Sequence, residues 1–211
     1  FFERRQPSLE AQLANLADAI AYNNHDVDDG IRAGLITMDE LRELAIVRRQ
    51  YDLVAARYPG LGARRMVHEV VRRMIDYLVN DLISASQAAI AAAAPASVED
   101  VRARAQPLLA FSAEVEAEHL ELKRYLRQHL YRHYKVLRMT TKARRVVREL
   151  FEAMIGDIEL MPTEHQQAAR RMESADGRSG RARAVADYIA GMTDRYAIRE
   201  YGRLFDPGER T

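Results

Sequence analysis

Residues 13–34, LANLADAIAYNNHDVDDGIRAG, combine an apolar and a polar face on one predicted helix. At about 100° per residue, one side of that helix gathers apolar side chains, and these are Leu9, Leu13, Leu16, Ile20 and Val27. The opposite side gathers polar ones within an arc of roughly 100°, and these are Asp18, Tyr22, His25, Asp26 and Asp29. The apolar face is wide enough to dock on a core, so this stretch predicts a packed helical fold.

The polar face contains acidic groups without nearby cations. No Lys or Arg occurs between Leu9 and Ile31, although surface helices commonly pair acidic residues with basic ones one turn away. Such a stripe is costly unless its groups are solvated, paired or bound to a cation. The pattern therefore leaves two interpretations open, a solvated acidic face and a surface that contacts a metal or a substrate.

Composition narrows the class of protein. The 211 residues are 48% hydrophobic and contain 32 basic and 31 acidic residues, for a net charge of +1. The chain can bury a sizeable core, and its charge does not indicate nucleic acid as a partner, although it leaves that partner open. There is no Cys, which excludes disulfides and thiolate metal sites. We expect a cytoplasmic protein with no membrane partner, because no apolar run spans a bilayer and the first residues, FFERRQP, lack the core of a signal peptide.

The remaining sequence also has helical spacing. No stretch alternates with period two, so we predict an all-α fold. Besides the first helix, we expect helices over residues 38–57, 63–94, 112–134, 136–156 and 184–205, the last interrupted near Gly191. We expect one unit over residues 1–211, with flexible segments near 95–112 and 174–183.

A second group of candidate residues lies in the run KRYLRQHLYRHYK, residues 123–135. Lys123, Arg127 and Tyr131 recur at about helical spacing. Cations beside aromatic rings suit a triphosphate next to a stacked base or sugar. A solvated basic face is the alternative interpretation.

Two strings, LADAIAYNNHDVDDG and DYIAGMTDRYAIREYGRLF, resemble the deoxyguanosinetriphosphate triphosphohydrolase-like branch of the HD-domain phosphohydrolases. The resemblance implies a helical hydrolase that converts a deoxynucleoside triphosphate to the deoxynucleoside and inorganic triphosphate. It also implies a divalent metal, with Mg or Mn expected, and a homo-oligomer.

The resemblance assigns roles to particular residues. Asp18 matches a metal ligand of the family, and Tyr22 and Asp26 match positions that line the deoxyribose pocket. Tyr131 is our choice for a family Tyr that contacts the nucleotide, with Lys123 or Arg127 neutralising phosphate charge. His25 is a candidate general acid or a partner of a metal ligand; a buried histidine with satisfied hydrogen bonds is the alternative.

One departure from the family pattern is large. The family's first metal-binding His and its His-Asp pair lie upstream of the motif that holds Asp18, and His25-Asp26 is not that pair. The resemblance therefore covers the C-terminal portion of the family's sequence, and we expect the 211-residue chain alone to be inactive. The alternative is a non-catalytic helical module that binds a nucleotide or a protein and lacks the upstream ligands.

Overall fold

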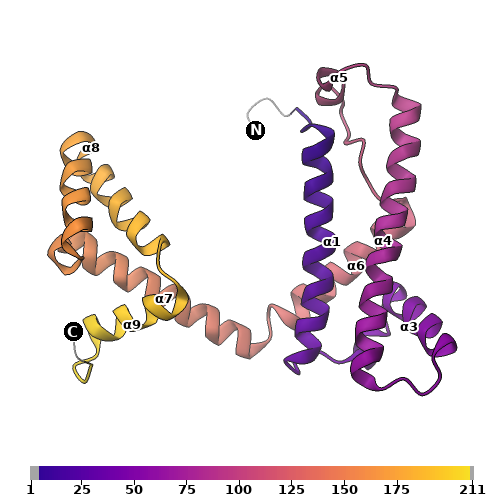
Figure 1. Ribbon diagram of the computed structural model, residues 1–211, viewed down its shortest axis with the longest axis horizontal. Helices are drawn as coiled ribbons and strands as arrows, with labels where there is room; N and C mark the ends of the chain where they lie inside the picture. Colours follow the sequence, from indigo (N-terminus) through magenta and orange to yellow (C-terminus); the bar gives the residue numbers. More distant parts are fainter. Residues whose placement is uncertain (1–4, 210–211) are drawn as a thin grey trace. The chain divides into compact units, whose positions relative to one another are not determined.

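The computed structural model describes residues 5–209, and within that range it contains helices and no strands (Figure 1). The predicted all-α fold is confirmed. The chain divides into two compact units, with the boundary between His133 and Tyr134. Our expectation of one unit over residues 1–211 did not include this boundary, which separates two clusters of buried apolar side chains.

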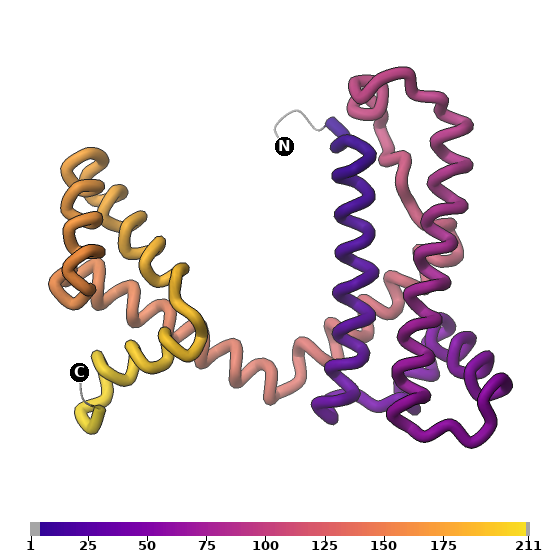
Figure 2. Tube along the Cα trace, viewed as in Figure 1, coloured from indigo at the N-terminus to yellow at the C-terminus, as the bar shows by residue number. Residues whose placement is uncertain are grey.

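The first unit is built on two long helices that lie side by side, α1 (Leu9–Arg32) and α4 (Ala63–Ala93) (Figures 1 and 2). Shorter elements complete it, namely α2 (Met38–Leu41), α3 (Ala45–Arg57), α5 (Val98–Arg102), α6 (Ala113–Tyr125) and the π-helix η1 (Leu126–Leu130). Its core includes Ile20, Val27, Val47, Met74, Leu78, Leu122 and Leu126. These residues recur at helical spacing, so each helix contributes one apolar face.

Two details of the first unit differ from the sequence prediction. The helix expected over residues 38–57 is two helices, because the capping box of Thr37 and Glu40 opens only a four-residue helix and the chain restarts at the extended residue Leu44. Leu13, expected on the docking face of α1, is 50% exposed. Polar Asn23 and Asn24 are buried instead.

Residues 103–112 are joined to α1 and α4 by hydrogen bonds. The side-chain oxygen of Gln12 accepts the backbone N–H groups of Leu108 at 2.9 Å and Leu109 at 3.1 Å. The carboxylate of Asp81 accepts the N–H of Ser112 at 2.8 Å. These contacts supply partners for a buried non-helical backbone. The flexibility expected near residues 95–112 stays a prediction.

The second unit contains α7 (Tyr134–Gly156), the 3₁₀ turn η2 (Ile158–Leu160), α8 (Thr163–Ala190) and α9 (Asp194–Phe205). Its core includes Val146, Leu150, Met154, Ala169, Val185, Tyr188 and Ile189. The break near Gly191 is confirmed, because Gly191 caps α8 and α9 starts at Asp194.

Residues 174–183, which we expected to be flexible, are helical on both sides of a kink in α8, and their flexibility stays a prediction. At the kink Gly177 has φ +59°, a conformation that favours glycine. The two arms of α8 then pack so closely that a Cβ on Gly180 would lie 2.0 Å from the carbonyl oxygen of Met172. The glycines of this run therefore allow α8 to form a tight helical hairpin (Figure 1).

Among residues 5–209, no helix is both long enough and apolar enough to cross a bilayer.

Candidate functional site

The first unit brings together Tyr22, Asp26 and Tyr131, which come from distant parts of the chain. Tyr131 caps the C-terminal end of η1 and donates a hydrogen bond from its phenol to the carboxylate of Asp26 on α1. Burial raises the pKa of Tyr131, and the hydrogen bond to Asp26 raises it further. Tyr22 also contributes to that raised pKa, so its hydroxyl faces the same pair.

Gly30 explains how η1 comes so close to α1. A Cβ at Gly30 would lie 2.8 Å from Cδ1 of Ile36 and 3.2 Å from Cδ1 of Leu130. A larger residue would collide with the Ile36 side chain and would crowd Leu130 of η1. Because Gly30 has no side chain, η1 can pack close to α1, and Tyr131 reaches Asp26, which lies one helical turn before Gly30.

The predicted polar face of α1 is accessible. Asp18 and His25 are exposed, and Tyr22 is 58% exposed, while Asp26 is half-buried beneath its bond to Tyr131. The buried, satisfied position considered for His25 is therefore not the one observed. An exposed aromatic ring beside a held carboxylate is a suitable surface for a ligand that has both an apolar face and hydroxyl groups.

The described residues do not complete a metal centre. Within residues 5–209, no three His, Asp or Glu side chains gather in a way that could hold a metal ion. Asp18 is thus a single candidate ligand, and one carboxylate does not fit the requirement of a catalytic cation for several ligands. No reaction step can be derived through a metal from these residues alone.

Lys123 and Arg127 lie in a different environment. Both are exposed and line a shallow hollow together with Ala117, Leu120 and Arg124. That lining includes no residue of α1. The structure therefore brings together Tyr22, Asp26 and Tyr131, whereas Lys123 and Arg127 line a hollow that includes none of these three residues.

A buried polar pair behind Tyr22 was not predicted. The side-chain nitrogen of Asn23 lies 3.3 Å from Nε2 of His119, and both residues are buried. Because the amide donates, the imidazole accepts at Nε2 and is neutral. Burial lowers the pKa of His119 accordingly. The sequence contains one signal for this buried pair, since Asn23 lies on the same side of α1 as the apolar residues Ile20 and Val27.

A second unpredicted feature holds α6 against its neighbours. Arg49 on α3 forms ion pairs with Glu118 at 2.7 Å and Glu114 at 3.0 Å, and it contacts the hydroxyl of Tyr77 on α4. Glu118 is nearly buried, and burial raises its pKa despite the neighbouring guanidinium. This cluster fixes the helix that leads into η1, and so indirectly positions Tyr131.

Comparison with known proteins agrees with the family resemblance that the sequence motifs indicate. Residues 109–203 match the family described as the phosphohydrolase-associated domain. Among curated proteins, the chain is 58% identical over 208 residues to a deoxyguanosinetriphosphate triphosphohydrolase-like protein of Bordetella pertussis. It is 53% identical over 205 residues to one from Thiobacillus denitrificans and 48% identical over 205 residues to one from Nitrosomonas europaea.

These matches cover nearly all of this chain, from 97% to 99%, but only 52% of each of the three relatives. The chain thus spans about half the length of the curated relatives it matches. In residues 109–203 the chain is thus similar to the phosphohydrolase-associated domain, and the residues that the structure describes are largely helical. The resemblance to deoxyguanosinetriphosphate triphosphohydrolase-like proteins, inferred above from two strings of sequence, is confirmed.

Proposed function

We propose that this chain forms part of an enzyme that hydrolyses a deoxynucleoside triphosphate, dGTP or a close analogue, to the deoxynucleoside and inorganic triphosphate. The Tyr22, Asp26 and Tyr131 surface is the observation that carries the proposal. The names of the relatives support the class of substrate. The rest of the catalytic machinery is proposed to lie in residues outside this chain, since the relatives are about twice as long.

In this proposal, Asp26 and Tyr22 bind the sugar. The carboxylate of Asp26 accepts a hydrogen bond from a sugar hydroxyl, and Tyr131 holds that carboxylate in place through its phenol. The exposed ring of Tyr22 packs against the sugar and excludes a 2′-hydroxyl by shape, which favours deoxyribose over ribose. A positioned carboxylate and ring orient the substrate without changing covalent bonds themselves.

Asp18 is proposed as one ligand of a divalent metal, Mg or Mn. It lies one helical turn before Tyr22 and is exposed, so its carboxylate can bind a cation together with ligands from outside this chain. The bound cation would supply Lewis-acid chemistry at a phosphate. His25 is proposed as a proton donor near this position, and Lys123 or Arg127 as cations for the triphosphate once the complete enzyme is assembled. A homo-oligomer in the cytoplasm completes the proposal.

A second candidate function is a non-catalytic helical module that binds a nucleotide or a protein. The observation that favours it is the lack of a metal-binding group of three side chains within residues 5–209. The two candidates differ in whether Asp18 holds a metal in a protein of the relatives' length.

The experiment compares Asp18→Asn with Asp29→Asn in such a protein, which combines this sequence with the remainder found in the relatives. Asp29 is an exposed carboxylate on the same helix and serves as the matched control. Elemental analysis should find the metal lost in the Asp18 variant and retained in the Asp29 variant. Equal metal content in both variants and in the parent would contradict the role of Asp18.

A further inference from the structure

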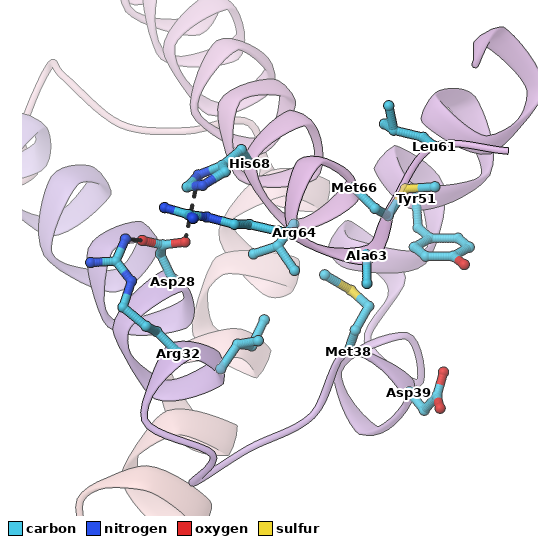
Figure 3. Close-up of a pocket in the computed structure, with 12 residues that line it drawn as sticks. Asp28, Arg32, Met38, Asp39, Tyr51, Leu61, Ala63, Arg64, Met66 and His68 are labelled. Atoms are coloured by element: carbon cyan, nitrogen blue, oxygen red, sulfur yellow. Dashed lines mark hydrogen bonds and ion pairs between the residues drawn. The ribbon is translucent and has the colours of Figure 1, made fainter. Parts of the chain in front are cut away.

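A large hollow of the first unit has a lining that includes none of Asp18, Tyr22, Asp26 and Tyr131. Its volume is about 840 Å³, within the range of roughly 300–1,000 Å³ that is usual for small-molecule sites. Figure 3 shows its lining, which comes from α1, α2, α3, the start of α4 and the loop between α3 and α4. The hollow is therefore large enough for a small organic ligand.

One end of the hollow has an excess of cations. Arg32 pairs with Asp28 at 3.0 Å, and Nδ1 of His68 lies 3.8 Å from the same carboxylate. Arg64 points toward this pair (Figure 3). No hydrogen bond or ion pair joins the side chain of Arg64 to another of residues 5–209. Arg32 therefore pairs with the carboxylate of Asp28, and the guanidinium of Arg64 is left for an anion.

The start of α4 adds backbone donors to the same end. Gly62 is the N-cap residue and has no side chain that could accept a hydrogen bond, and the first intrahelical bond runs from the N–H of Met66 to the carbonyl of Gly62. The N–H groups of Ala63 and Arg64 are therefore without helical partners. With the positive end of the helix dipole, they favour an anion at the start of α4.

The rest of the hollow is apolar. Its wall consists of aliphatic, thioether and aromatic side chains, namely Ile31, Met38, Tyr51, Leu61, Met66 and Val67. The other carboxylate in the lining, Asp39, points away from Arg64 (Figure 3) and pairs with Arg42 at 3.8 Å. An anionic head at Arg64 could thus have a compact apolar body attached to it.

We propose that this hollow binds a small organic phosphate, with the phosphate at Arg64 and the start of α4 and the organic part against Met38 and Met66. A phosphate fits better than a single carboxylate because this end of the hollow offers both guanidinium and backbone donors, and phosphate has three oxygens to accept from them. The proposal does not depend on the function proposed above, since the two sites have no residue in common.

The test uses the 211-residue chain labelled with ¹³C on the methionine methyl groups, and NMR titration with phenyl phosphate. Met38 and Met66 should shift in a saturable way, while buried Met74 should not. Inorganic phosphate, which lacks the apolar part, should bind more weakly. Arg64→Ala should weaken binding of phenyl phosphate by roughly tenfold, the loss of one charge-assisted contact.

Arg65→Ala is the matched control, because Arg65 is the exposed neighbour that does not line the hollow. It should leave the affinity within about twofold. An unchanged Met74 signal reports that each variant is folded. The proposal is overturned if phenyl phosphate leaves Met38 and Met66 unshifted, or if both Arg variants lose affinity equally. Asp18→Asn should not alter the titration, so failure of this site is separable from failure of the proposed enzyme function.

Discussion

Tyr131 donates a hydrogen bond from its phenol to the carboxylate of Asp26, which precedes it by 105 residues in the sequence. This contact joins η1 to α1 and holds a half-buried carboxylate next to the exposed ring of Tyr22. The arrangement converts a polar stripe on one helix into a surface built from two segments. It is the feature from which the proposed sugar contact follows.

Removing the phenol of Tyr131 should destabilise the first unit. We expect Tyr131→Phe to lower the free energy of unfolding by about 1 kcal/mol, because the bond to Asp26 is lost. Tyr125→Phe is the control, since the hydroxyl of Tyr125 is buried and finds no hydrogen-bond partner in the described chain. Urea unfolding measures both variants. A loss of stability in Tyr125→Phe equal to that in Tyr131→Phe would contradict the assignment.

Breaking the ion pair between Arg49 and Glu118 should cost more. We expect Arg49→Ala to destabilise the chain by about 2 kcal/mol, less than for a fully buried pair because the Arg49 side chain is 39% exposed. The reason is that Glu118, whose side chain is only 9% exposed, would lose its partner. Exposed Arg48 is the neighbouring control, and Arg48→Ala should change the unfolding free energy little. Similar losses in the two variants would show that the pair is not important.

The buried imidazole of His119 should make stability depend on pH. Burial lowers its pKa in the folded state below the ordinary value of 6.5, so the unfolded state binds the proton more readily. This contribution to stability is complete above that value and is lost as the pH falls through it toward the folded pKa. Between pH 7.5 and pH 5, His119→Gln should therefore lose less stability than the parent chain. His25→Gln, which alters an exposed histidine, should follow the parent; if His119→Gln does as well, the imidazole does not carry the effect.

The sequence predicted the elements that depend on local spacing and capping. The long helix predicted at residues 63–94 and the break near Gly191 are both present in the structure. Each of these is determined by residues within a few positions of one another, so helical periodicity and capping chemistry are sufficient.

Other features could not be predicted because they depend on contacts between distant segments. The run around Gly177 and Gly180 has the composition of a loop, yet close packing of its two arms makes it a helical hairpin. The burial of Asn23 depends on His119, 96 residues later. Likewise, spacing placed Lys123 and Arg127 near Tyr131 along the chain, but the structure places them in a hollow without α1 residues.

The most direct test of the proposed function is product analysis on a protein of the relatives' length that contains this sequence. Incubated with dGTP and Mg²⁺ or Mn²⁺, it should release deoxyguanosine and inorganic triphosphate in equal amounts, and Asp18→Asn should abolish that release. Release of pyrophosphate or single phosphate groups instead, or undiminished triphosphate release by the Asp18 variant, would contradict the account.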